Sequence, residues 1–289
     1  MKDYDNLLID IDGAVATITF NQPDLLNPID DNAMGTLLEA LEELDDGDAV
    51  RVIRLKGAGR AFSAGGDLRS IYEKFDYKPT RTGDGPAELG GSRAEMDRNW
   101  LKILIKQFLA LAAYRKPVIA QVHGYCIGGG IELIGASDVI FAAEDAKFGH
   151  PPIRAHGILP TFGGWPFRLG ALKTKELIFS GDLIDGKEAE RIGMINRAIP
   201  ADRLDDYTMA YCQRISNTPL DALSIGKHWT NRWFELAGAV TAAMEGAEFD
   251  AVLHATPAFD EFVRIAKADG VGAAIAWRDA AFKTPLPVY

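Results

Sequence analysis

The chain has 289 residues and a formal net charge of −10, which argues against nucleic acid or an anionic membrane as a partner. Its 47% hydrophobic and 25% charged residues are typical of a soluble globular protein, and no apolar run is long enough to span a membrane. The two cysteines, Cys126 and Cys212, form neither a disulfide framework nor a zinc motif, and acids precede the first apolar run, so we expect a cytoplasmic protein without a signal peptide.

The N-terminal segment predicts a hairpin, then a helix, then a strand. Residues 7–11 and 15–20 are rich in β-formers and flank a strong turn signal, Asp12-Gly13. After a loop with two prolines, Asp30 or Asp31 is expected to cap a helix. The apolar face of that helix would carry Met34, Leu37, Leu38, Leu41 and Leu44. Residues 50–55 are rich in β-branched side chains and predict the next strand.

Two glycine-rich turns each follow a predicted buried strand. The first covers residues 56–68, and the second, residues 128–130, follows the strand at 117–122 and opens an apolar helix at Ile131. Glycines let a ligand or another segment approach the backbone closely, and Glu132 lies in the first turn of the helix. Two converging N–H donors and a nearby carboxylate could stabilise an oxyanion and move a proton. Each turn taken singly is equally well explained as a plain tight turn. Glu132 could also serve only the helix dipole, but its glycine context favours catalysis.

The later elements alternate between helix and strand before becoming helical. Residues 75–98 lack periodicity and are expected to form a mobile surface loop, part of which could act as a lid. Residues 99–113 carry a helical apolar stripe. Further predictions are a strand at 139–142 with a short piece at 146–148, a turn leading into a strand at 193–199, a loop at 149–157, and helices at 165–169, 171–179 and 186–192. The pattern then stays helical to residue 282, which divides the chain into an α/β part, 1–203, and a helical part, 204–289.

A dinucleotide site is the obvious alternative for the first turn. Residues 57–62, GAGRAF, follow a strand and begin like a dinucleotide fingerprint. The third glycine is missing, and the expected helix, strand and ribose-binding acid do not follow. A nucleotide-binding oxidoreductase would therefore have to be supported by tight NAD(P) binding, which we do not expect.

The paired stretches AFSAGGDL (61–68) and HGYCIGGGIEL (123–133) resemble the signatures of the enoyl-CoA hydratase/isomerase, or crotonase, superfamily. The resemblance spans nearly the whole chain, because four later segments also fit: SDVIFAAEDAKFGHP (137–151), GILPTFGG (157–164), GMINRAIP (193–200) and DGVGAAIAWRDAAFK (269–283). It implies an α/β fold, a crotonase (ClpP-like) spiral of ββα units over residues 1–203 that holds an acyl-CoA site. Residues 204–289 would form a C-terminal helical region that drives assembly into homotrimers or hexamers (dimers of trimers).

The resemblance also implies site residues. The backbone N–H groups of Gly66 and Gly129 would hold the thioester oxygen, and Glu132 would transfer the proton. The substrate and its CoA would meet the residues Leu26, Ala64, Asp67, Leu68, Gly124 and Pro152. Asp67 is at the same time interpreted as a loop-capping carboxylate.

The sequence departs from the family pattern at the second acid. Hydratases of this family use two glutamates, but the second position falls at or beside Pro152, where the sequence GHPPIRAHG has no acid and the loop is one residue longer. Glu132 could serve both proton transfers, or His150 or His156 could supply the second function, since histidine titrates near neutrality. Both histidines could instead only line or cap the loop.

Other prominent side chains are interpreted as structural. We expect His123 to be a hydrogen-bonded structural histidine, Cys126 to pack rather than react, and Lys147 and Arg154 to be solvated rather than phosphate ligands. Trp229 and Trp233 share one helix face and are interpreted as helix-packing or subunit-contact residues. Long apolar stretches in residues 237–281 favour oligomerisation.

The sequence therefore predicts an acyl-CoA enzyme. Hydration of a 2-enoyl-CoA ranks first, double-bond isomerisation second, and hydrolysis of a thioester or C–C bond third. A non-catalytic acyl-CoA-binding protein remains the alternative of a different class. No metal and no redox cofactor is implied, because CoA arrives as part of the substrate, and the loops at 75–98 and 149–157 would shape the acyl pocket.

Overall fold

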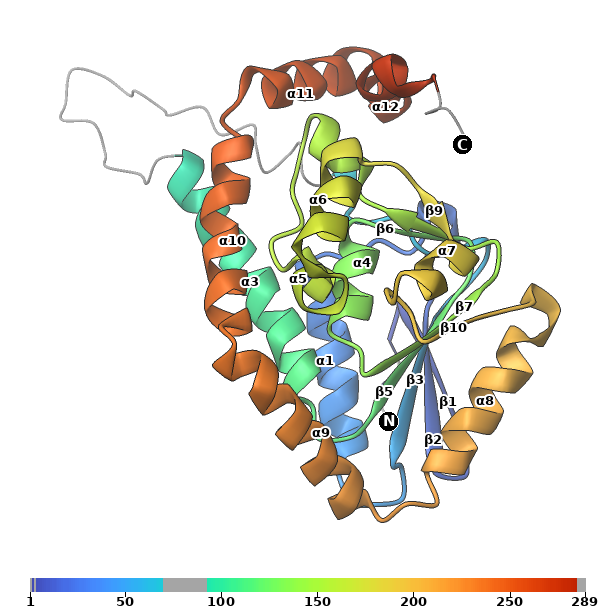
Figure 1. The fold of residues 1–289 in the computed structure, drawn as a ribbon. Helices are drawn as coiled ribbons and strands as arrows, with labels where there is room; N and C mark the ends of the chain where they lie inside the picture. The colour runs from blue at the N-terminus through green and yellow to red at the C-terminus, as the bar shows by residue number, and fades with distance from the viewer. Residues whose placement is uncertain (1, 3, 70–92, 285–289) are drawn as a thin grey trace.

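The computed structural model describes residues 2, 4–69 and 93–284 (Figure 1). Its strands are β1 (Leu7–Asp12), β2 (Val15–Phe20), β3 (Val52–Gly57), β4 (Ala61–Ser63), β5 (Val118–Val122), β6 (Tyr125–Ile127), β7 (Val139–Ala143), β8 (Lys147–Gly149), β9 (Ile184–Asp185) and β10 (Arg197–Ile199). Its α-helices are α1 (Asp31–Asp45), α3 (Arg93–Ala113), α4 (Gly129–Gly135), α5 (Trp165–Arg168), α6 (Gly170–Ser180), α7 (Gly186–Arg191), α8 (Leu204–Ile215), α9 (Leu220–Leu236), α10 (Ala239–Leu253), α11 (Pro257–Asp269) and α12 (Val271–Asp279). Short 3₁₀ helices are η1 (Pro23–Leu25), η2 (Pro151–Arg154), η3 (Phe162–Gly164), η4 (Ala201–Arg203) and η5 (Ala280–Phe282).

The described strands form two sheets. The larger has the order β1-β2-β3-β5-β7-β10 and the smaller the order β4-β6-β8-β9. Only the terminal pairs β1–β2 and β8–β9 are antiparallel among these strands; the rest run parallel. The consecutive pairs β3–β4, β5–β6 and β7–β8 each place one strand in the large sheet and the next in the small sheet. This repeated unit brings the two glycine-rich turns, which follow β4 and β6, to one region of the molecule.

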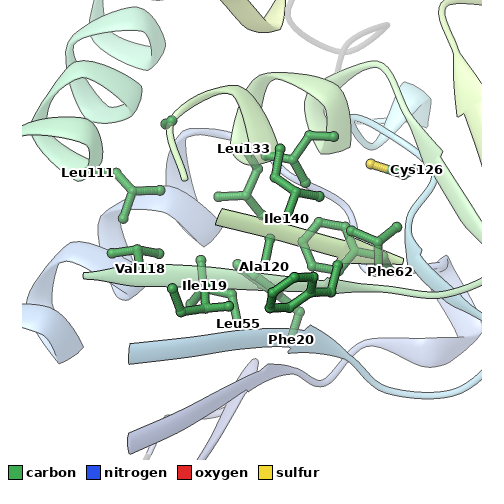
Figure 2. Close-up of a cluster of buried hydrophobic side chains, with 14 of the residues drawn as sticks. Phe20, Leu55, Phe62, Leu111, Val118, Ile119, Ala120, Cys126, Leu133 and Ile140 are labelled. Atoms are coloured by element: carbon green, nitrogen blue, oxygen red, sulfur yellow. The ribbon is translucent and has the colours of Figure 1, made fainter. Parts of the chain in front are cut away.

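The core lies between the large sheet and the helices that cover it. Strands β3 and β5 are buried on both faces, as expected for parallel strands in the middle of a sheet. Figure 2 shows their side chains Leu55, Ile119 and Ala120 packed with Leu111 of α3 and Leu133 of α4. Helices α1 and α3 lie on one side of the large sheet, and α8 packs against β3, β5 and β7 on the other (Figure 1).

Most predicted elements are present, but several bounds differ. Strand β4 lies within residues 56–68, which were predicted as one glycine-rich turn, and of residues 193–199 only Arg197–Ile199 form a strand. The helix expected at 99–113 begins at Arg93, so residues 93–98 are helical rather than part of a loop. Its apolar stripe starts only at Leu101, which is why the first turns gave no periodic signal. Helix α4 begins at Gly129, two residues before the predicted Ile131, because Gly128 at φ 54° and ψ −116° forms its N-cap. The remainder of the expected loop, residues 75–92, lies outside the described residues.

The C-terminal region is helical, as predicted, and packs onto the α/β part. Helix α10 lies along α3 (Figure 1), where small residues of α10, Ala243, Ala247 and Ala251, allow close contact with Leu101 and Ile105. Helices α11 and α12 pack against each other. Within residues 2, 4–69 and 93–284, none of the helices combines the length and the apolar character needed to cross a membrane.

Candidate active site

The two glycine-rich turns meet in space. A Cβ atom on Gly65 would lie 3.6 Å from the backbone nitrogen of Gly129, and Gly65 itself has φ +100°, a conformation that favours glycine. A Cβ on Gly129 would lie 3.0 Å from the carbonyl oxygen of Ile29. The amide of Ile29 in turn donates a hydrogen bond to the Gly65 carbonyl (3.0 Å). Glycine at these positions therefore allows three segments, residues near 29, 65 and 129, to approach backbone to backbone.

A cavity of about 120 Å³ opens beside this contact. All five residues predicted to be catalytic line it: Gly66, Gly129, Glu132, His150 and His156. Asp67, Leu68 and Pro152, predicted to meet the substrate, line it as well. Helix α3 provides an apolar wall made of Trp100, Leu101, Leu104, Ile105 and Phe108. The structure thus brings together residues from six separate stretches of the chain.

Glu132 is the buried carboxyl group at the centre of this site. The backbone N–H of Thr161 donates to its Oε1 (3.0 Å) and that of Gly163 donates to its Oε2 (3.3 Å). Burial raises the pKa of Glu132 to about 8, against the opposing effect of the two amides, and the charge of Asp250 raises it further. Glu132 is therefore protonated at neutral pH and held in one orientation.

The premise that His150 and His156 titrate near neutrality is wrong. Burial lowers the pKa of His150 to about 4, although its Nε2 contacts the Gly157 carbonyl oxygen (3.0 Å). Burial lowers the pKa of His156 well below its usual range, and its ring stacks on Phe262 with centroids 4.0 Å apart. Both imidazoles are neutral at pH 7, so neither is poised to exchange a proton there. They remain cavity-lining residues whose catalytic role is untested.

A second buried carboxyl group lines the cavity, and it comes from a segment whose sequence pattern predicts only oligomerisation. Asp250 of α10 and His254, the C-cap residue of that helix, both line the cavity and are both buried. Asp250 Oδ1 accepts a hydrogen bond from the Ile158 amide (2.8 Å), and His254 Nδ1 lies 2.7 Å from Oδ2 of the buried Asp97 on α3. The expected division at residue 203 stays a prediction, but residues on both sides of it line the cavity.

A sequence signal for these residues existed. Asp250 and His254 are four residues apart and follow the small buried residues Ala243, Gly246 and Ala247 along one face of the helix. A polar pair on the buried stripe of a helix needs partners, because burying an unpaired polar group is costly. What the sequence could not reveal is that Asp97 and Ile158, distant along the chain, supply those partners.

Three of the residues predicted to bind the substrate lie outside the cavity lining. Leu26, at φ 60°, and Ala64 are joined by a hydrogen bond from the Ala64 amide to the Leu26 carbonyl (3.0 Å). Gly124, at φ +58°, lies so close to the Arg60 carbonyl that a Cβ atom would overlap it, which explains the glycine structurally. The roles of these three residues in CoA binding stay predictions. Asp67 accepts a hydrogen bond from the Arg69 amide (3.0 Å), consistent with a loop-stabilising carboxylate.

Arg154 is not solvated, contrary to expectation. Its side chain is 8% exposed, and its guanidinium donates to Asp182 (2.7 Å), Asp279 (3.0 Å) and the Ser180 carbonyl (2.9 Å), which ties η2 to α12 and to the end of α6.

Three other structural interpretations, of Lys147, His123 and Cys126, are confirmed. Lys147 is exposed, as expected. His123 contacts the Gly59 carbonyl oxygen through Nε2 (2.8 Å). Cys126 is fully buried, and burial holds the pKa of its thiol well above its usual range, which disfavours the reactive thiolate.

Comparisons with known proteins agree with the fold and the site described above. Residues 10–258 match the family model described as enoyl-CoA hydratase/isomerase. A probable enoyl-CoA hydratase of Mycobacterium bovis is 35% identical over 80% of this chain and 83% of its own, and one of Rhizobium meliloti is 33% identical over 97% of this chain and 98% of its own. The crystal structure of an enoyl-CoA hydratase from Mycobacterium smegmatis superposes with a TM-score of 0.86 and 29% identity, covering 96% of this chain and 94% of that one. The expected α/β fold with a helical C-terminal region is thereby confirmed, and the chain belongs to the enoyl-CoA hydratase/isomerase family.

Proposed function

We propose that the protein is a 2-enoyl-CoA hydratase, which adds water across the double bond of a 2-enoyl thioester. The observation that carries the proposal is the buried carboxyl of Glu132, fixed by two backbone amides in the cavity that Gly66 and Gly129 also line. The names of the relatives support the same reaction class. CoA enters as part of the substrate, and no metal or redox cofactor takes part.

In this proposal the backbone N–H groups of Gly66 and Gly129 hold the thioester oxygen. Addition of water at the β-carbon pushes the electrons of the double bond onto that oxygen as an enolate. Donors already in place stabilise such a charge by roughly several kcal/mol, because they need no reorganisation when it forms. Support comes from the contact between the two turns and from the presence of both glycines in the cavity lining.

Glu132 would then donate a proton to the α-carbon. A general acid must carry its proton at the working pH, and the raised pKa of about 8 meets this condition at neutrality. The apolar wall from α3 would accommodate the acyl chain beyond the reacting carbons.

The proposal is tested with a panel of 2-enoyl-CoA and 3-enoyl-CoA thioesters, short-chain and aromatic, given to the wild type and to Glu132→Gln. Mass spectrometry follows gain of water and release of CoA, and chromatography separates double-bond isomers. We expect gain of water on a 2-enoyl-CoA, reduced about 10²- to 10⁴-fold in the variant, as is typical for loss of a general acid. Isomer formation without water gain would identify an isomerase, and CoA release a hydrolase. Binding without any product would identify a non-catalytic acyl-CoA-binding protein.

We also propose a homotrimer, or a hexamer formed by two trimers. Its support is the apolar surface of α9, where Ile225 (69%), Trp229 (62%), Trp233 (65%) and Leu236 (69%) are exposed in the single chain. The rings of Trp229 and Trp233 contact each other edge to face, with centroids 6.1 Å apart, so they form one apolar patch. Sedimentation equilibrium measures the number of copies in the assembly.

A cytoplasmic location is proposed as well, supported by two free and buried cysteines, Cys126 and Cys212.

A further inference from the structure

One face of α10 is shaped to reach the cavity. Gly246, Asp250 and His254 follow one another at intervals of four residues, so they lie on the same side of the helix. A Cβ atom on Gly246 would overlap the Pro160 carbonyl, so glycine is what lets the helix backbone lie against the loop at 157–163. A Cβ on Gly157 would lie 3.8 Å from Asp250 Oδ1 and 4.0 Å from His254 Nε2. The close approach of helix and loop thus places both polar side chains at the cavity.

The loop at 157–163 fixes two carboxyl groups at once. The amide of Ile158 donates to Asp250, and the amides of Thr161 and Gly163 donate to Glu132. Both carboxyl groups line the cavity, and Asp250 is close enough for its charge to raise the pKa of Glu132. Two carboxyl groups held by one short loop have a defined position relative to each other, which is what a two-step proton transfer requires.

The groups that face Asp250 set its charge. His254 Nε2, on the same helix, lies 3.6 Å from Asp250 Oδ1. Across from α10, Asp97 of α3 binds His254, Glu132 projects from α4, and the neutral His156 lies in the loop after η2. Burial lowers the pKa of His254, but the hydrogen bond to Asp97 and the charges of both aspartates outweigh it, so the net pKa is raised and the imidazolium is favoured. The protonated form of His254, where present, stabilises the Asp250 carboxylate beside it.

The two carboxyl groups differ in protonation at neutral pH. Burial raises the pKa of Asp250 to about 6, although the charge of His254 and the Ile158 amide oppose the increase. At pH 7 Asp250 is therefore mainly ionised, whereas Glu132, with a pKa of about 8, is mainly protonated. Environments that push the pKa values of two neighbouring carboxyl groups apart are typical of an acid and a base that work together.

We propose that Asp250 is the second proton-transfer carboxylate of this enzyme, taking the place of the acid that is absent at Pro152, and that His254 and Asp97 position it. The proposal rests on the hydratase function proposed above. Asp250 would be a catalytic residue because it faces the cavity, whereas His254 and Asp97 would act through it.

In the reaction, Asp250 accepts a proton from water as the water oxygen bonds to the β-carbon. The electrons of the carbon–carbon double bond move to the α-carbon and the thioester oxygen, giving the enolate. Glu132 then delivers its proton to the α-carbon, and the thioester carbonyl reforms. The product has gained one water, Asp250 is protonated and Glu132 is ionised. Net transfer of one proton from Asp250 to Glu132, directly or through solvent, restores the starting state, so no further reactant is needed.

A purely structural role is the alternative, because a buried aspartate–histidine network could simply anchor α10 to the loop. Two substitutions distinguish a catalytic role of Asp250 from a structural one. Asp250→Asn keeps the shape and an oxygen that can accept from Ile158, but it removes the base. Asp250→Glu keeps the base but overfills a packed site. A structural role requires Asn to be tolerated better than Glu, whereas the catalytic role requires Glu to retain more hydration activity than Asn.

The pH dependence of kcat/KM for hydration provides a readout that anchoring would not affect. We expect a bell-shaped profile in the wild type, with limbs near pH 6 for Asp250 and near pH 8 for Glu132. Asp250→Asn should lose about 10²- to 10⁴-fold in kcat/KM and lose the acidic limb. His254→Gln removes the imidazole whose charge lowers the pKa of Asp250, so that pKa should rise and the acidic limb should shift to higher pH. His228→Gln, on the exposed part of α9, is the matched control and should leave the profile unchanged.

The outcomes distinguish this proposal from the hydratase function itself. If the wild type adds no water to any 2-enoyl-CoA, the proposed function fails. If the wild type hydrates and Glu132→Gln does not, yet Asp250→Asn keeps near-wild-type activity and an unchanged acidic limb, the role of Asp250 alone is overturned. Should Asp250→Asn not fold, the His254→Gln profile decides: a shifted acidic limb supports the proposal, and an unshifted one contradicts it.

Discussion

At the scale of the residue, the sequence was sufficient to identify Glu132 as a candidate, and the structure adds its environment. Its type and its place after three glycines were sufficient to single it out. Its protonation was beyond the sequence, because it depends on burial and on the charge of Asp250, which comes from a distant helix. The same limit explains the histidines: their side-chain type suggested titration near neutrality, and only burial shows that they are neutral.

The raised pKa of Glu132 implies that the free energy of unfolding depends on pH. The folded pKa of about 8 exceeds the ordinary value of 4.5, so between these values the folded state binds more protons than the unfolded state. The contribution of Glu132 is fully present below pH 4.5 and is lost as the pH rises towards 8 and beyond. Glu132→Gln does not titrate, so its free energy of unfolding relative to the wild type should increase with pH, by roughly 1 kcal/mol per unit between pH 5 and 8. Urea denaturation of both proteins at pH 5, 6.5 and 8 measures this, and a constant difference would contradict a buried, protonated Glu132.

At the scale of the element, the strand–turn units were predictable and the helix ends were less so. Strands β3 and β5 are mostly buried runs rich in β-branched and other apolar residues, bounded by turn signals, which the sequence shows directly. Helix α3 begins before its apolar stripe. Asp250 and His254 lie in and at the end of α10, a segment whose apolar content predicted only oligomerisation. The sequence pattern shows which residues are apolar, but the neighbour that covers each face is set by tertiary packing.

The packing of α4 against η3 can be tested at Gly135. A Cβ atom there would lie 2.5 Å from the Cα of Gly163, whose amide holds Glu132. Gly135→Ala should therefore push the loop away from Glu132, reduce hydration activity and lower the free energy of unfolding by about 1–3 kcal/mol.

Gly35→Ala in the interior of α1 is the matched control for this substitution. Its Cβ would meet only Gln107 Nε2, at an ordinary 3.6 Å. It should keep the activity and stabilise the protein by roughly 0.5–1 kcal/mol, the usual gain from replacing a helical glycine. Equal effects of the two substitutions in urea denaturation and in the hydration assay would refute the packing argument.

At the scale of the whole molecule, the cavity is assembled from segments that the sequence assigns to different parts. Helices α3 and α4, the loop at 157–163 and α10 converge there. The family resemblance was sufficient to predict the α/β fold and the position of Glu132. It could not predict the contribution of α10, because the family pattern places its second acid near Pro152, where this chain has none. That α10 lines the cavity is a property of the folded chain and cannot be seen in the sequence.

We predict that Glu132 and Asp250 act as one unit in the addition of water. The most direct measurement is kcat/KM for hydration of a short 2-enoyl-CoA at pH 7 by the wild type, Glu132→Gln, Asp250→Asn and the double variant. We expect each single variant to lose about 10²- to 10⁴-fold and the double variant to lose no more than about tenfold beyond the worse single one, because groups that serve one step are not additive. Losses that multiply, or a wild type that adds no water, would contradict the account.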